Sequence, residues 1–288
     1  MTRLKRYLKN LVKPALLFSA ISFLLILGCF DSNIQPTYKE EDIPYLVKKI
    51  CKDEYSLDVT ATRTPTTLWI YAPLDKLLHK DYGVKEDKFF DDEITEKLRN
   101  IITTTGRVLI SSDNAPEFYA ILASDIQSGI DYTMIGNVMD IKKSYAGTIP
   151  MMEANRRYVV DFKAAPEAIG DLTGNHLKGR NITLPVFLAE QIAQRISFRF
   201  QDEWLKDYFK VESSTGKFGK YTFKIEYEIT QIKKPPKKII IKNEVLDIIA
   251  YCLKTYDFKD FSMVEVTDLA TKERSDLSKA VILARPIN

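Results

Sequence analysis

Cysteine and histidine are the side chains here best suited to covalent or acid–base chemistry, and both are scarce. Two cysteines, Cys51 and Cys252, fall in segments with helical periodicity, and the two histidines are His79 and His176. A disulfide between the two cysteines would close a very long loop and stabilise the fold by about 4–5 kcal/mol in the chain-entropy model. The alternative, which the apolar neighbours of Cys51 favour, is that both thiols are buried in helices as small apolar groups.

The histidines have no partners at the spacing of a metal or catalytic motif. The sequence contains no His-Glu-x-x-His and no Cys-x-x-Cys, so it does not indicate a zinc site, and we expect no metal or other cofactor. A Cys–His nucleophile pair is conceivable, but nothing in the local sequence supports it. His176 stands in a glycine-flanked loop, so we expect its ring to be solvated. Glycine-rich nucleotide motifs and the Gly-x-Ser-x-Gly elbow are also absent.

Two charged clusters could bind ions or surfaces. Acidic residues gather between Asp87 and Glu96, where the spacing fails the pattern of a calcium-binding loop and fits the start of a helix. Four lysines flank Pro235 and Pro236, and we expect them on a solvated turn where they guard a sheet edge. The alternative is contact with anionic lipid headgroups or an acidic partner. These lysines are Lys233, Lys234, Lys237 and Lys238.

The first 28 residues have the pattern of an export signal. They carry five of the 42 basic residues and no acidic one, and they include an uninterrupted run of apolar and small residues from Ala15 to Leu27. This run is shorter than the roughly 20 residues of a transmembrane helix and fits the apolar core of a secretory signal. The remainder of the chain is close to neutral, which gives no case for nucleic-acid binding.

The segment Ile26-Leu27-Gly28-Cys29 resembles the lipobox of bacterial lipoproteins. The resemblance implies cleavage before Cys29 and modification of its thiol with acyl chains such as palmitate, and two or more chains anchor a protein stably. It therefore implies an extracytoplasmic protein held on a bacterial membrane. In lipoproteins of bacteria with two membranes, an aspartate directly after the lipidated cysteine tends to retain the protein at the inner membrane. Phe30 stands at that position here, so the resemblance favours the outer membrane. The alternative is an uncleaved anchor helix with an incidental cysteine.

The mature chain is expected to have two α+β halves. We predict a signal peptide at 1–28, a polar tether at 29–40, an N-terminal half at 41–172 and a C-terminal half at 181–288. Helical spacing predicts helices at 42–54 and 92–110, within a broken stretch at 138–163, after Thr183 and from Asn243. Alternating residues predict strands at 56–62, 67–72, 117–123, 130–135, 221–229, 261–266 and 280–283.

These elements repeat a helix–strand–strand order up to four times. The motif Cys-x-x-x-Tyr stands at the end of two predicted helices, at Cys51 and at Cys252. We therefore predict an α+β fold of repeated αββ-like units that form antiparallel or mixed sheets with helices on one face. We expect a non-enzymatic interaction or structural module that binds a protein of the cell envelope. The alternative is a ligand-binding or hydrolytic lipoprotein with a cleft between its two halves.

Overall fold

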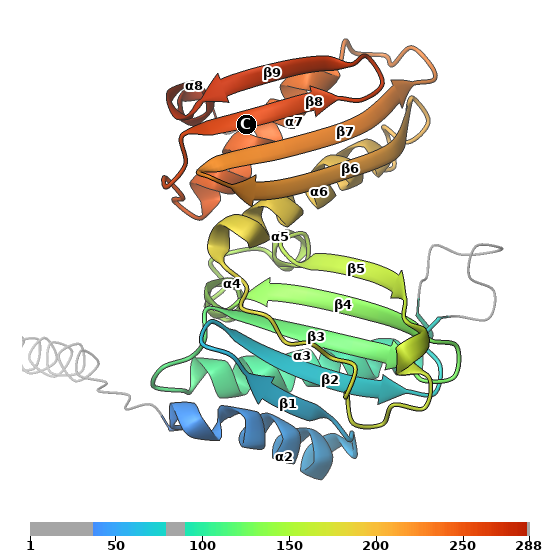
Figure 1. The fold of residues 1–288 in the computed structure, drawn as a ribbon, viewed down its shortest axis with the longest axis vertical. Coiled ribbons are helices and arrows are strands. Elements are labelled where there is room, and N and C mark those ends of the chain that lie inside the picture. The colour runs from blue at the N-terminus through green and yellow to red at the C-terminus, as the bar shows by residue number, and fades with distance from the viewer. Residues whose placement is uncertain (1–36, 79–89, 287–288) are drawn as a thin grey trace, which may run out of the picture. The chain divides into compact units, whose positions relative to one another are not determined.

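The computed structural model describes residues 37–78 and 90–286 and has an α+β fold (Figure 1). The strands form one five-stranded and one four-stranded sheet, and each sheet is mixed. None of the helices in this part of the chain is both long and apolar enough to cross a membrane. The signal segment, Cys29 and His79 lie outside the described residues.

The five-stranded sheet and its helices come first in the chain. Its first helix has Pro44 in the first turn, where the missing N–H costs no hydrogen bond, and ends before Ser56, which is left-handed with φ 56°. The elements are η1 (Glu40–Asp42), α2 (Ile43–Tyr55), β1 (Thr60–Arg63), β2 (Thr67–Leu74), α3 (Asp92–Ile110), β3 (Phe118–Asp125), β4 (Ile130–Asn137), α4 (Val138–Tyr145), α5 (Met151–Asn155), β5 (Val159–Ala164) and η2 (Pro166–Ala168).

The four-stranded sheet follows a long loop. The predicted helix after this loop is present, with Thr183 at its N-cap position and Pro185 in its first turn. The elements are α6 (Leu184–Gln201), β6 (Phe209–Gly219), β7 (Thr222–Gln231), α7 (Ile241–Thr255), β8 (Met263–Asp268), β9 (Glu273–Ser278) and α8 (Lys279–Ala284).

Each sheet contains two αββ units, which confirms the predicted repeat. The units are α2-β1-β2, α3-β3-β4, α6-β6-β7 and α7-β8-β9. Strands within a unit pair antiparallel, whereas β2 pairs parallel with β3 and β7 parallel with β8. The parallel pairs arise because α3 and α7 carry the chain back across the sheet. Strand β5 pairs antiparallel with β4, so the spatial order is β1-β2-β3-β4-β5 in one sheet and β6-β7-β8-β9 in the other.

The central strands of the five-stranded sheet are buried on both faces. Successive side chains of a strand point to opposite faces. In β2, Leu68 and Ile70 belong to the core under α2 and α3, whereas Trp69 between them belongs to the core that contains α6. The face that carries Trp69 is crossed by the long loop between β5 and α6 (Figure 1). The alternation therefore separates this sheet into a helix face and a loop face.

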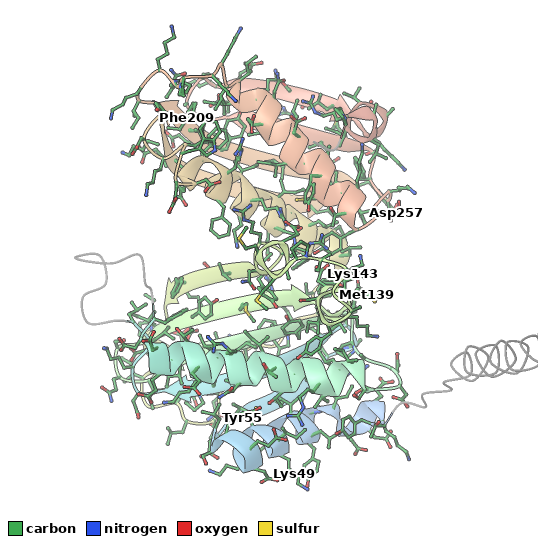
Figure 2. All side chains as sticks on the ribbon, turned by 180° about the vertical axis from the view of Figure 1, so that it is seen from behind. Lys49, Tyr55, Met139, Lys143, Phe209 and Asp257 are labelled. Atoms are coloured by element: carbon green, nitrogen blue, oxygen red, sulfur yellow. The ribbon has the colours of Figure 1, made fainter. Side chains whose placement is uncertain are left out.

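The four-stranded sheet has helices α6 and α7 on one face (Figure 2). The residues between the buried ones in β7 are mostly charged and exposed. Tyr221 was expected on the buried face, but it precedes the strand with φ 58° and is 60% exposed, because the tight turn from β6 ends there. The residues of β7 that pack under the helices are Phe223, Ile225, Tyr227 and Ile229.

Two other predicted elements differ from the structure. Residues 280–283, predicted as a strand, lie in helix α8, and the last strand is β9 just before it. A short apolar run fits both the helical and the strand period, which explains the error. The stretch 138–163 contains the predicted broken helix as α4 and α5, separated by residues 146–150, but its last residues form the edge strand β5, which was not predicted.

Candidate functional site

The loop between β5 and α6 turns around the carboxylate of Asp171, and the hydroxyl of Tyr71 on β2 donates to the Asp171 carbonyl oxygen at 2.5 Å. One carboxylate oxygen accepts hydrogen bonds from the backbone N–H groups of Thr173 and Gly174, both at 2.9 Å. The other accepts from the backbone N–H of His176 at 3.0 Å. Gly174 has φ 78° and lies so close to Tyr71 that a Cβ there would be 2.7 Å from the Tyr71 ring. This turn needs glycine and places His176 on the sheet.

The ring of His176 is enclosed between two carboxylates. Its side chain is 6% exposed, and Nδ1 lies 2.7 Å from Asp171 Oδ2. Because an ionised carboxylate only accepts hydrogen bonds, Nδ1 carries the proton, and Nε2 points away from Asp171. Nε2 lies 3.4 Å from Oδ1 of Asp131, a side chain with no solvent exposure. The prediction that the His176 ring is solvated was therefore wrong, because Asp171 folds the loop back over it.

The carboxylates are fixed by further hydrogen bonds. Ser124 Oγ donates to Asp131 Oδ1 at 2.5 Å, and Lys163 Nζ lies 3.7 Å from Asp131 Oδ2. Burial by itself would raise the pKa of Asp171, but hydrogen bonds from the His176 ring and from backbone amides hold it well below its usual range. Asp171 is therefore ionised at neutral pH and can orient the imidazole.

Asp131, Lys163 and His176 line a pocket of about 710 Å³ on the loop face of the five-stranded sheet. One wall comes from β2 to β5 and from residues 176–178 and 180 of the loop, and the opposite wall from α6 and β6. Trp69 forms part of the floor, and its Nε1 donates to the carbonyl oxygen of Arg180 at 2.9 Å. A pocket of this volume accommodates a small molecule.

Strand β6 approaches α6 very closely at this pocket. A Cβ at Gly216 would lie 1.9 Å from the carbonyl oxygen of Ala189, so this position requires glycine. The contact brings Ser214 and Thr215 into the pocket wall. Strand β6 thereby contributes side chains to a site whose other polar groups belong to the five-stranded sheet and its loop.

Three buried polar atoms of this pocket make no hydrogen bond with any described protein group: Asp131 Oδ2, His176 Nε2 and Ser214 Oγ. The rim carries charges of both signs. Arg180 Nη2 lies 3.3 Å from Glu190 Oε1, and burial raises the Glu190 pKa despite this partner. The pocket therefore combines a polar interior with a mixed rim.

No protein-family model matches the chain, and no curated protein or solved structure is significantly similar to it. The function must therefore be inferred from the chemistry of the site.

The two cysteines singled out in the sequence lie apart from this pocket. Both are buried free thiols, Cys51 in the core under α2 and α3 and Cys252 in the core that contains α6 and α7. The disulfide considered from the sequence is not formed. Burial raises the pKa of Cys252 to about 12, so its thiol is not a nucleophile at neutral pH. The ring nitrogens of His176 face carboxylates rather than either thiol.

The charged clusters singled out in the sequence also lie outside the pocket. The four lysines between β7 and α7 are exposed, at positions 233, 234, 237 and 238. The described part of the acidic cluster surrounds the start of α3, with Asp91 at the N-cap position and Asp92 and Glu93 in the first turn. Within residues 37–78 and 90–286, no group of three or more His, Cys, Asp or Glu side chains is placed to hold a metal ion.

Sequence reasoning missed Asp131, Asp171 and Ser214. Asp131 sits in an alternating strand at a position that faces inward, and an acid there is a signal of a buried polar site. Asp171 followed by Thr173 and Gly174 has the composition of an Asx turn. Ser214 gave no signal, because β6 itself was not predicted.

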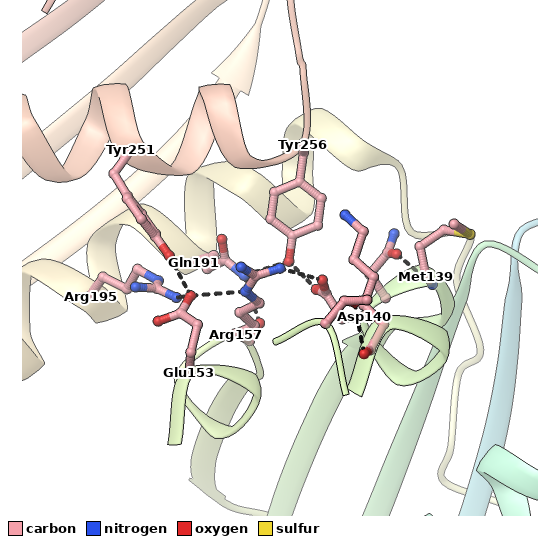
Figure 3. A network of polar contacts seen from close by, with 11 residues as sticks. Met139, Asp140, Glu153, Arg157, Gln191, Arg195, Tyr251 and Tyr256 are labelled. Atoms are coloured by element: carbon pink, nitrogen blue, oxygen red, sulfur yellow. Dashed lines mark hydrogen bonds and ion pairs between the residues drawn. The ribbon is translucent and has the colours of Figure 1, made fainter. Parts of the chain in front are cut away.

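A second polar cluster joins α4 and α5 to α6 and α7 (Figure 3). The buried Arg157 donates to Asp140 Oδ1 at 2.7 Å and to Glu153 Oε1 at 2.9 Å. The same Glu153 oxygen accepts from Arg195 and from the Tyr251 hydroxyl, both at 2.6 Å.

Two further groups complete this cluster. The hydroxyl of Tyr256 donates to Asp140 and accepts from Gln191 Nε2 at 3.1 Å, and Gln191 Nε2 also donates to the carbonyl oxygen of Arg157. Burial by itself would raise the Glu153 pKa, but these hydroxyl and guanidinium partners lower it. Every charged group of the cluster has a partner of opposite charge, so we interpret it as a structural tie between the two sheets.

Proposed function

We propose that the protein is a ligand-binding lipoprotein that holds a small polar molecule in the pocket around His176. This is the alternative that the sequence left open, rather than the interaction module expected first. The observation that carries it is the convergence of three buried polar atoms without protein hydrogen bonds, on Asp131, His176 and Ser214. An unmade hydrogen bond at a buried polar group costs about 1–3 kcal/mol. A ligand that makes these bonds offsets that cost.

The buried atoms without hydrogen bonds to described residues define the kind of group that binds. Asp131 Oδ2 is an acceptor, and the Ser214 hydroxyl can accept as well as donate. Two acceptors in one pocket favour a ligand with clustered donors. A primary ammonium group and a pair of adjacent hydroxyls both fit this description.

The rest of the pocket supports a ligand with an apolar surface as well. Trp69, Leu122, Ile135 and Leu177 line the pocket beside the polar groups. Amino acids and sugars both combine clustered donors with an apolar face. Ligand sites commonly pair such apolar walls with a few polar groups that fix orientation.

The proposed location rests on the N-terminal sequence. Lipidation at Cys29 would hold the pocket outside the cytoplasm at a bacterial membrane, with the outer membrane favoured. The test is a Cys29→Ala variant followed by membrane fractionation. Loss of processing and of membrane association is expected, and an unchanged distribution would contradict the anchor. This test is independent of the pocket.

Binding can be tested by isothermal titration calorimetry on the full chain in detergent. The probes are L-lysine and glycine for the ammonium class, glucose and N-acetylglucosamine for the hydroxyl class, and acetate as a probe without clustered donors. We expect saturable binding of one of the two donor classes and none of acetate. Asp131→Asn should weaken that binding at least tenfold, because the amide replaces one acceptor with a donor.

The matched control is Asp161→Asn on the exposed rim of the same pocket. It removes the same charge without touching the buried acceptors, so it should change affinity less than threefold. Circular dichroism verifies that both variants are folded. Equal affinity of wild type and Asp131→Asn for every probe, or no saturable binding of any probe, would contradict the proposal.

Hydrolysis is a second candidate, favoured by the orientation of His176 by Asp171. A carboxylate that orients an imidazole whose second nitrogen has no hydrogen-bond partner among the described residues is the arrangement of a general base. In this case His176 Nε2 would take a proton from a water that attacks the bound ligand. Release of nitrophenol from p-nitrophenyl acetate that disappears in His176→Gln would support it. If wild type and His176→Gln release nitrophenol at the same rate, hydrolysis by His176 is refuted and the ligand-binding proposal remains.

A further inference from the structure

A second pocket lies on the helix face of the five-stranded sheet. The side chains of β4 alternate between the two pockets, with Asp131 and Thr133 in the first and Tyr132 and Met134 in the second. Helix α3 runs along this face and α4, which carries the labelled Met139 and Lys143, lies beside it (Figure 2). The volume of this second pocket is about 660 Å³. The sheet therefore separates it from the site proposed above.

The walls of the second pocket are mainly apolar. Strand β3 and helices α3, α4 and α5 contribute to them together with β4. At the rim, Met151 is 75% and Tyr145 59% exposed. Exposed methionines adapt their shape to apolar ligands. The apolar side chains that form the walls include Leu98, Ile102, Met134, Ile141 and Met151.

An aromatic cluster lies at the β4 end of the pocket. The ring of Tyr132 is 5.0 Å from that of Phe90 and 4.8 Å from that of Phe162, measured between centroids. Burial raises the pKa of Tyr132 to about 12, so its hydroxyl stays protonated and can donate. Tyr158 provides a second hydroxyl at the pocket.

The described lining of the second pocket also carries one positive charge without a negative charge beside it. Among the described residues that line it, Arg99 is the one charged side chain. Arg99 is exposed on α3 and forms no ion pair with any described residue. An apolar cavity with a single free guanidinium at its rim is complementary to a molecule with an apolar tail and an anionic head.

We propose that this pocket binds a single-chain amphiphile of the fatty-acid class. The acyl tail lies among the apolar side chains of α3, α4 and β4, and the carboxylate pairs with Arg99. This site is distinct from the His176 pocket, so it stands whether or not that pocket binds a polar ligand.

The experiment is photolabelling of the full chain in lipid nanodiscs. The probe is dodecanoate with a diazirine near the end of the tail, and labelled residues are mapped by mass spectrometry of peptides. We expect label on α3, α4 and α5. Unlabelled dodecanoate should compete, and each methylene removed from the competitor should weaken competition about fourfold. Dodecyltrimethylammonium, with the opposite charge, should compete much less.

The variant that tests the head-group contact is Arg99→Gln. It should reduce labelling by the fatty acid at least fivefold and leave labelling by the matching diazirine alcohol unchanged. Lys97→Gln is the matched control, because Lys97 is on the same helix, pairs with Glu93 and does not line the pocket. Lys97→Gln should leave labelling by the fatty acid and labelling by the alcohol unchanged.

A filling variant tests the tail contact. Thr103→Trp places a large ring in the pocket and should reduce labelling by both the acid and the alcohol. If it does not fold, Arg99→Gln still decides the proposal. Label spread evenly over the chain, or equal labelling of wild type and Arg99→Gln, would overturn it.

Discussion

Replacing Arg157 with methionine should lower the free energy of unfolding by about 3 kcal/mol. Removing one partner of a buried ion pair costs about 3–5 kcal/mol, because the other charge stays buried and unpaired. Arg157 has two such partners in Asp140 and Glu153. Glu153 keeps Arg195 and the Tyr251 hydroxyl, which places the expected loss at the lower end of that range.

The charge left behind on Asp140 dominates this loss. Its side chain is 7% exposed, and Arg157 is its cation. After the substitution, the Tyr256 hydroxyl remains as its hydrogen-bond donor. A second substitution, Asp140→Asn, removes the stranded charge. The double variant should therefore recover a large part of the stability that Arg157→Met loses.

The assay is equilibrium unfolding in urea followed by circular dichroism. If the free energy of unfolding falls by about 2–3 kcal/mol per M of urea, a loss of about 3 kcal/mol in Arg157→Met should lower the urea midpoint by about 1 M. The matched control is Arg156→Met, since Arg156 is exposed and precedes Arg157 directly. It should shift stability by less than about 0.5 kcal/mol. Equal midpoints for the two variants would refute the conclusion that this cluster ties the sheets together.

Three further outcomes are expected. Gly216→Ala should destabilise the protein by about 1–3 kcal/mol in the same urea assay, because its Cβ would overlap a backbone oxygen of α6, whereas Gly219→Ala, with nothing within 4 Å, should not. Iodoacetamide should alkylate Cys51 and Cys252 only after denaturation, since burial raises both pKa values, and a disulfide-linked peptide in the mass spectrum would contradict this. The pKa of Glu153 is lower in the folded protein than its ordinary value of 4.5, so the ionised carboxylate stabilises the fold above that pH. Acid should therefore destabilise wild type below about pH 5 more steeply than it destabilises Glu153→Gln, and parallel pH profiles of the two proteins would contradict this expectation.

The αββ order could be predicted because the apolar residues of most elements recur with one clear period, either helical or alternating. In β7, alternate residues from Phe223 to Ile229 are apolar, and they are the buried ones. In α2, Ile43, Val47 and Cys51 repeat every four residues and face the core. Strand β6 escaped prediction because it is an edge strand in which polar residues dominate both faces. Its place is determined by pairing with β7 and packing on α6.

The candidate site could not be predicted because its residues are distant in sequence. Asp131 lies in a central strand, His176 in a loop and Ser214 in the strand that was missed. The loop has the composition of a solvated segment, and the feature that folds it inward is a set of hydrogen bonds to the Asp171 carboxylate. These hydrogen bonds are local to the loop and leave no periodic signal, and the contact that they create, between His176 and Asp131, joins residues distant in sequence.

The order of the elements has a consequence for how the pocket is assembled. All strands of the five-stranded sheet are synthesised before β6, but side chains of its loop face such as Trp69 share a core with α6 and are covered only after α6 has been made. The β6 wall of the pocket is synthesised later still, and the α7 side of the Arg157 cluster after it. The pocket can therefore bind a ligand only once β6 has folded against α6. A ligand that bridges β4 and β6 would select chains that include β6 over shorter ones.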